Sequence, residues 1–401
     1  MTSILDCEME SLAGNNREQS SICLREKNTV KANNKVIQHQ TGKSYVTAYE
    51  EIKTTNDDLI NQRIYNIQAN LYDMKFKGPK ESSKQPNLRT NSIQPHKDIP
   101  FNPSTRRKKK SSKNKVFGDH LVEKEDSVIR IVSQNVNCIG VSHEINHKQE
   151  NAKDWMIQHS VDIVGWQETG VAFHTLPRHK RLAHRMKDIR WKKMRISSSN
   201  NKNENIETFQ YGGTAVMAFD QAAHRVKSTG ADSTGLGRWS WILFEGKQKY
   251  MTRIISAYVP CKSTCDRRQT VYNQHKRYFQ KLGNTECPRK LMHAHLTENI
   301  KSWQMKGENI VLLIDTNENL AQMGQLQSKL CYECQLIDPI RAIYQKKKTS
   351  LPPTSLTGSV PIDSIFVSAQ LQDITRGGWI QIEKSIGDHR ALFIDIPYIC
   401  C

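Results

Sequence analysis

Acid and amide side chains recur at the ends of apolar runs in the second half of the chain. An apolar run that ends in polar residues is typical of a buried strand, and strand ends are where a sheet presents reactive side chains. One such residue is a weak signal, because turns also favour Asp and Asn. Several in one chain predict a shared site. The residues concerned are Asn135, Glu168, Asp315 with Asn317, Asp363, and Asp388 with His389.

The carboxylates and amides in this set predict a site for a hard divalent cation. Mg²⁺ takes oxygen ligands, and Mn²⁺ is the alternative metal. We expect Glu168 to be a ligand, with Asn135 brought beside it by neighbouring strand ends and Asp388 free to ligate as well. The plain alternatives are an exposed loop acid at Glu168 and a turn residue at Asn135.

A second group of residues has the types needed to handle a water molecule and a phosphate. Asp315 and Asn317 would point the same way if the strand continued through them, so they could orient a water and hold a phosphate oxygen. An Asx turn that ends the strand is the alternative. Tyr258, two residues before Pro260, could offer its hydroxyl to a phosphate. Taken alone, it is more simply an ordinary half-buried strand tyrosine.

The acid Asp363 stands among apolar residues and needs a partner if it is buried. His389 is the natural one, since a buried acid would fix the imidazole and raise its pKa. The sequence has no serine or cysteine nucleophile motif and no glycine-rich phosphate loop. The chemistry that we predict is therefore metal-assisted attack of water on a phosphate ester.

Strands and helices alternate irregularly after residue 126, which predicts two packed sheets flanked by helices. The apolar runs predict strands over residues 128–133, 162–166, 213–218, 239–245, 252–258, 308–315, 362–368 and 391–396. The two strands around residue 246 are expected to form an antiparallel pair. The residues 177–207 are expected to form an inserted basic loop with a poorly defined strand. Helices are predicted over residues 151–160, 268–282, 290–306 and 319–329, the third of them closed by Gly307.

The composition divides the chain into two regions. With 37% hydrophobic residues and a mean hydropathy of −0.66, the whole chain is too polar to be packed throughout. We expect residues 1–125 to be a disordered, basic N-terminal region and residues 126–401 to hold the folded domain. The first region has 22 basic and 15 acidic residues, so +12 of the net charge of +19 belongs to the domain. Such a balance predicts a polyanionic partner, with nucleic acid ahead of a membrane surface.

A concentrated basic run stands within the N-terminal region. Its residues include Arg106, Arg107, Lys108, Lys109 and Lys110, and it suits a nuclear-import address or an arm that binds DNA phosphates. A solvated linker explains it as well. No apolar leader or membrane-spanning run is visible, and the ten cysteines are scattered. We expect an intracellular monomer that acts on DNA and does not enter a membrane, with a nuclear location as one alternative.

The ordered set of motifs resembles the endonuclease/exonuclease/phosphatase superfamily, the DNase I-like proteins, over about residues 127–401. Any one of the motifs would be weak evidence, whereas seven in the family order are specific. The resemblance implies an α/β (α+β) fold, a four-layer α/β sandwich of two packed mixed β-sheets flanked by helices. The motifs are Gln134-Asn135-Val136-Asn137, Trp166-Gln167-Glu168-Thr169, Tyr211-Gly212-Gly213-Thr214-Ala215-Val216, Ala257-Tyr258-Val259-Pro260, Asp315-Thr316-Asn317, Ile362-Asp363 and Gly387-Asp388-His389-Arg390.

The resemblance also implies a role for each residue. Asn135, Glu168 and Asp388 would surround the metal. Asp315 would position or activate the water, with Asn317 and Tyr258 on the phosphate. His389, oriented by Asp363, would stabilise the pentacovalent transition state.

Within the superfamily, residues 387–396 look most like the endonuclease domains of non-LTR retroelements, which implies a Mg²⁺-dependent DNA endonuclease. No Tyr-x-Asp-Asp motif of a reverse transcriptase is present, so we expect a stand-alone or truncated copy. Pro361 and Ser364 depart from the family, which usually has Arg and Tyr there, and this leaves a catalytically decayed nucleic-acid-binding relic open. An apurinic repair endonuclease, a phosphatase and an RNA deadenylase also remain open.

Overall fold

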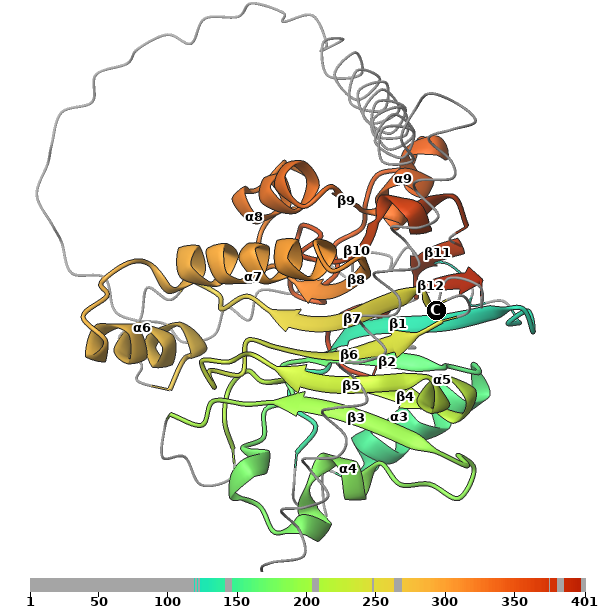
Figure 1. Cartoon of the computed structure of the whole chain (residues 1–401), viewed down its shortest axis with the longest axis horizontal. Coiled ribbons are helices and arrows are strands. Elements are labelled where there is room, and N and C mark those ends of the chain that lie inside the picture. Colours follow the sequence, from blue (N-terminus) through green and yellow to red (C-terminus); the bar gives the residue numbers. More distant parts are fainter. Residues whose placement is uncertain are drawn as a thin grey trace, which may run out of the picture. The chain divides into compact units, whose positions relative to one another are not determined.

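The computed structural model describes residues 119, 121, 123–140, 146–203, 209–246, 249–262, 269–374, 376–380 and 386–397. They form two mixed sheets of six strands each, with helices outside them (Figure 1). The predicted fold class is confirmed. The basic run lies outside the described residues, and the domain boundary at residue 125 stays a prediction. Within the described part of the chain, no helix has the length and apolar character to cross a bilayer.

The first sheet joins the start of the domain to its end. Its order is β11-β12-β1-β2-β4-β3. The strand β1 pairs in parallel with β2 and antiparallel with β12, although some 260 residues separate β1 from β12. The strands are β1 (Val128–Asn135), β2 (Ile163–Gln167), β3 (Met194–Ser199), β4 (Thr214–Phe219), β11 (Arg376–Trp379) and β12 (Leu392–Pro397).

The second sheet has the order β5-β6-β7-β8-β10-β9. The predicted antiparallel pair around residue 246 is β6 and β7, and the next neighbours β7 and β8 run in parallel. Strand β10 then returns antiparallel to β8. The strands are β5 (Val226–Ala231), β6 (Trp239–Glu245), β7 (Met251–Tyr258), β8 (Glu308–Asp315), β9 (Leu336–Ile337) and β10 (Asp363–Ser368).

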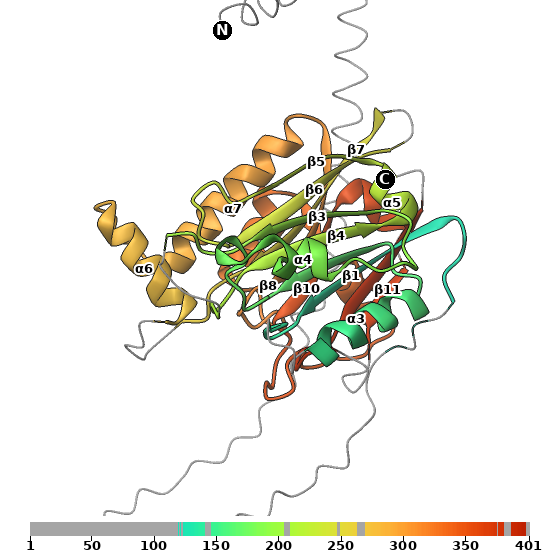
Figure 2. The same cartoon turned by 90° about the horizontal axis from the view of Figure 1, so that it is seen from below.

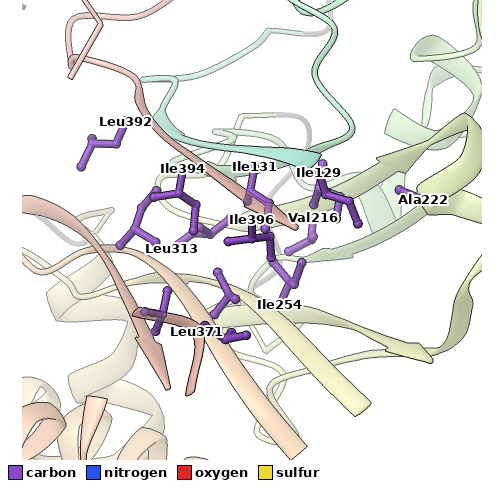
Figure 3. Close-up of a cluster of buried hydrophobic side chains, with 14 of the residues drawn as sticks. Ile129, Ile131, Val216, Ala222, Ile254, Leu313, Leu371, Leu392, Ile394 and Ile396 are labelled. Atoms are coloured by element: carbon purple, nitrogen blue, oxygen red, sulfur yellow. The ribbon is translucent and has the colours of Figure 1, made fainter. Parts of the chain in front are cut away.

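Three apolar clusters show that the fold has four layers. The inner cluster lies between the sheets, where Ile131 and Val216 of the first sheet face Ile254 and Leu313 of the second (Figure 3). A second cluster packs α3 (Asn146–Gln158) on the outer face of the first sheet. A third packs α7 (Pro288–Gln304) on the outer face of the second sheet (Figures 1 and 2). Burial of these faces holds the sheets at a fixed separation.

The remaining helices agree only in part with those predicted from the sequence. Thr270 caps α6 (Val271–Lys281) by accepting a hydrogen bond from the Asn273 amide. The helix predicted over residues 319–329 is mostly wrong: a turn precedes the short α8 (Gln325–Ser328), which a π-helical turn follows. The helix α9 (Pro339–Lys346) was not predicted, although Asp338 caps it. The short helices α4 (Leu182–Arg185) and α5 (Asp220–His224) complete the set.

Candidate active site

The strand topology brings the predicted acids and amides to one edge of the sandwich. Asn135 ends β1, and Glu168 follows the parallel neighbour β2 directly. In the second sheet Tyr258 and Asp315 end the parallel strands β7 and β8 and lie opposite each other. Asp363 begins the antiparallel β10 and also lies opposite Asp315. Parallel strands end at the same edge, and an antiparallel strand begins there, so the five side chains converge.

Asn135 connects the two sheets at this edge. Its Nδ2 donates to Oε2 of Glu168 at 2.9 Å and to Oδ2 of Asp315 at 2.8 Å. Its Oδ1 accepts from the backbone amide of Asn137 at 2.9 Å. In this arrangement the buried side-chain amide of Asn135 orients two carboxylates, and its Oδ1 accepts the hydrogen bond from Asn137. The metal-ligand role predicted for Asn135 therefore stays a prediction, and positioning Glu168 and Asp315 is what its hydrogen bonds do.

Asp363 and His389 form the expected pair. His389 Nδ1 lies 2.7 Å from Oδ2 of Asp363, and both residues are buried. Burial by itself would disfavour the imidazolium, but the charge of Asp363 and its hydrogen bond outweigh burial and raise the pKa of His389 to about 10. His389 is consequently a cation at neutral pH, fixed in orientation by Asp363.

Asp315 lies against this pair. A carboxylate oxygen of Asp315, a carboxylate oxygen of Asp363 and a ring nitrogen of His389 all lie within 4.8 Å of one another. Burial, and then the negative charge of Asp363, raise the pKa of Asp315 well above its ordinary value. A carboxylate whose proton affinity is raised, placed beside a buried cation, has the properties of a general base for water.

Asp388 lies beside the pair and offers an unused oxygen. Its Oδ2 accepts from Nδ2 of Asn137 at 3.0 Å, whereas its Oδ1, within the described residues, is buried without a hydrogen-bond partner. A buried, unpaired carboxylate oxygen is costly unless a ligand completes it. Glu168 would add a second carboxylate, and oxygen ligands of this kind suit a hard divalent cation, so the metal-ligand role of both residues stays a prediction.

Tyr258 is buried and its side chain is hydrogen-bonded to Glu168. Burial, and then the charge of Glu168, raise the pKa of the phenol well above its usual range. The hydroxyl is therefore protonated and can only be a donor to anionic groups at this edge. Its prediction as a phosphate contact stays a prediction.

The premise for Asn317 is wrong, because β8 ends at Asp315. Asn317 adopts a left-handed conformation with φ of 47°, and its amide donates to Oδ1 of Asp315 at 2.9 Å. This is the Asx turn that was the alternative interpretation. The Nδ2 of Asn317 donates to the carbonyl of Val259 at 2.8 Å, which ties the turn after β8 to the end of β7.

Three supporting residues were not singled out from the sequence. Arg289 of α7 donates to the carbonyls of Pro260 at 2.7 Å, Thr316 at 3.2 Å and Asn317 at 3.3 Å, so it holds both turns. Asn137, which holds Asp388, stood in a quoted motif. Arg289 gave no sequence signal, because its partners, the three carbonyls and the carboxylate of Glu318, come from distant segments.

The third supporting residue, Gln167, joins the sheets directly beneath the site. Its Nε2 lies 3.0 Å from Oγ of Ser256 and 3.3 Å from the carbonyl of Leu313, both in the second sheet. Ser256 donates in return to the carbonyl of Trp166 at 2.8 Å. At Gly165 a Cβ would lie 2.4 Å from Cδ1 of Leu313, so the close approach of the sheets requires glycine there.

Pro361 and Ser364, the two departures from the pattern of the superfamily that the sequence resembles, make their contacts away from the Asp363–His389 hydrogen bond. Ser364 points to the opposite side of β10 from Asp363, and its hydroxyl donates to Asp338, the cap of α9. The carbonyl of Pro361 accepts from the amide of Leu320 at 2.9 Å. Both residues are hydrogen-bonded to neighbouring segments of the fold, and the hydrogen bond between Asp363 and His389 is present beside them.

Comparisons with known proteins assign no family to the chain. No protein-family model matches it. No curated protein matches it. Among solved structures, the chain is similar to the human Nocturnin catalytic domain with bound sulfate anion, at 12% sequence identity and a TM-score of 0.46. The match covers 69% of this chain and 96% of that chain. At this identity and TM-score, the similarity indicates neither a substrate nor an activity.

Proposed function

We propose that this protein is a divalent-metal-dependent nuclease of the endonuclease/exonuclease/phosphatase superfamily that hydrolyses phosphodiester bonds in DNA. One observation carries the proposal. The amide of Asn135 holds Glu168 of one sheet against Asp315 of the other, directly beside the Asp363–His389 pair. Hydrolysis of a phosphate ester requires a base, a cation and oxygen ligands in one site, and Asp315, His389 and Glu168 would supply them.

The side chains divide the chemistry between them. Asp315 accepts the proton of the attacking water, since its pKa is raised by burial and by Asp363. His389, held as a cation by Asp363, stabilises the negative charge that develops on the phosphoryl oxygens. Tyr258 donates its hydroxyl within the same site.

Glu168 and Asp388 would hold the divalent cation, which we propose to be Mg²⁺, with Mn²⁺ able to replace it. When bound, the cation supplies charge stabilisation to the phosphate and the leaving oxygen. The observation that supports this assignment is the buried, unpaired Oδ1 of Asp388.

A nucleic acid is the proposed substrate because the chain carries a net charge of +19 and a concentrated basic run, and DNA is preferred to RNA because of the resemblance to retroelement endonucleases. A small phosphate ester would not need that charge. We further propose that the basic run at Arg106–Lys110 contacts DNA phosphates and that the domain derives from a retroelement endonuclease, as the resemblance of residues 387–396 suggests.

A substrate panel tests the proposal. Supercoiled plasmid, an abasic duplex, an RNA oligonucleotide and inositol phosphates are incubated with the protein in Mg²⁺, in Mn²⁺ and in EDTA. Nicking of plasmid that requires metal and disappears in His389→Ala, but not in the exposed control variant Lys290→Ala, supports a DNA endonuclease. Exclusive cleavage of the abasic duplex, the RNA or the inositol phosphates would replace DNA endonuclease with the corresponding alternative. No metal-dependent hydrolysis of any substrate would favour the decayed relic.

A further inference from the structure

Two exposed aromatic rings, Phe209 and Tyr211, contact each other beside the candidate active site. Each side chain is 47% exposed. The ring centroids are 4.7 Å apart and the rings meet edge to face at 82°. Isolated exposed apolar side chains are ordinary on protein surfaces. Two rings in contact, both open to solvent, form a surface suited to a flat ligand.

The backbone places these rings next to the loop that follows Glu168. The amide of Gln210 donates to the carbonyl of Gly170 at 3.1 Å, and the amide of Gly170 donates to the carbonyl of Gly212 at 3.0 Å. The amide of Thr169 donates to the carbonyl of Gly213 at 3.3 Å. The aromatic pair therefore lies along the segment that carries one of the proposed metal ligands.

Buried amides hold the segment from below. Nε2 of Gln210 donates to the carbonyl of Asn201 at 2.8 Å, and Nδ2 of Asn201 donates to Oε1 of Gln274 at 3.0 Å. All three residues are almost completely buried. At Gly212, where φ is 83°, a Cβ would lie 2.9 Å from Val271. The rings are thus presented on a tightly fitted support, which lowers the entropy cost of binding a ligand.

Positive charge lies near the same support. The side chains of Arg181 and Lys202 are exposed, and burial, followed by both of their charges, lowers the pKa of the nearby His174. The ring of His174 is hydrogen-bonded to Asn200, which in turn contacts Gln210. Aromatic rings combined with nearby cations are the usual means of holding a nucleic-acid strand without reading its sequence.

We propose that Phe209 and Tyr211 stack on an unpaired base of the substrate strand close to the scissile phosphate, so that the enzyme prefers unpaired or looped strands to a fully paired duplex. A base within a duplex must first leave its own stack before it can reach the rings. This inference rests on the proposed nuclease function and adds the strand state that the site selects.

The test compares binding and cleavage of two substrates of the same sequence, one single-stranded oligonucleotide and its perfect duplex. The full chain is assayed as wild type, Phe209→Ala, Tyr211→Ala, the double variant and Tyr211→Trp. Tyr250→Ala is the matched control, because Tyr250 is 51% exposed and precedes β7, at the opposite end of the strand from Tyr258. Binding is measured by fluorescence anisotropy in EDTA, and cleavage as kcat/KM in Mg²⁺. Melting temperatures confirm that the variants are folded.

We expect the double variant to lose roughly 5- to 100-fold in affinity and in kcat/KM on the single strand, the range that base–aromatic stacking gives. Its loss on the duplex should stay within about twofold, and Tyr211→Trp should retain single-strand binding. Equal losses on both substrates, or no loss on either, would overturn the inference. Ring-dependent binding of the single strand without any cleavage would refute the nuclease function while supporting this surface. Metal-dependent cleavage that the ring substitutions leave unchanged would support the nuclease function and refute the stacking surface.

Discussion

The substitution Asp363→Asn tests most directly the roles proposed for Asp363 and His389. Asn keeps the shape and the hydrogen-bond acceptor but removes the charge that holds His389 as a cation. In the native protein the pKa of His389 is raised to about 10, compared with an ordinary value of 6.5. Burial is the largest single influence on His389, and it acts to lower the pKa. In the variant the charge of Asp363 is gone and the remaining hydrogen bond is to a neutral amide, so Asp315 and Asp388 are the only charges that still oppose burial, and we expect the pKa to fall to 6.5 or below.

The size of the effect follows from these two values. At pH 8 a group with a pKa of about 10 is about 99% protonated, whereas one with a pKa of 6.5 is about 3% protonated. If only the cationic form stabilises the transition state, Asp363→Asn should lose at least roughly 30-fold at pH 8 from protonation alone. The deficit should shrink toward pH 6, because the variant imidazole regains its proton there.

The assay is a pH–rate profile of metal-dependent DNA cleavage, with His389 followed directly by NMR titration. The alkaline limb of the variant should move to lower pH. Ser364→Ala is the matched control, since it perturbs the same strand on its opposite side and should leave the limb in place. In a double-mutant cycle, Asp363→Asn should add little to His389→Ala. An unmoved alkaline limb together with strictly additive losses would refute the reasoning.

The remaining predictions concern metal, pH, loops and tail. Glu168→Gln should abolish most cleavage and lose the rise in melting temperature that Mg²⁺ gives, without melting earlier than wild type in EDTA; full plasmid nicking by this variant would exclude the assignment. In metal-free protein the raised pKa of His389 stabilises the fold fully below pH 6.5, and this contribution is lost as pH rises through 10; urea unfolding across that window should show the slope in wild type and not in Asp363→Asn. Arg289→Lys should lower kcat about tenfold, because an ammonium cannot reach three carbonyls in two turns, while the exposed Lys290→Ala should not; equal kcat for both would mean that the turns need no such support. Deleting residues 1–115 should weaken DNA binding and flatten its salt dependence; an unchanged slope would show that the basic run does not touch DNA.

The sequence by itself determined most of the strands that carry the site. The strand over residues 308–315 was predicted with its observed bounds, because an uninterrupted apolar run is sufficient to identify a strand buried on both faces. The identities of the acids were also readable, since each stands next to one end of such a run. The strand β5 was missed, because it lies at the sheet edge with most of its residues exposed, and only its pairing with β6 makes it a strand.

Only the tertiary structure decided what each polar side chain does. Asn135 was predicted near a metal, and the structure shows its amide bridging two sheets. Asn317 was predicted to face a phosphate, and a turn directs it to the carbonyl of Val259, the residue after β7. Arg289 carries no local signal, and the motif that contains Gln167 does not reveal its contacts, because the partners of both come from strands and turns some 30 to 150 residues away. Periodicity reports which residues are buried, whereas hydrogen bonds across sheets depend on register and separation, and these are set only when the sheets pack.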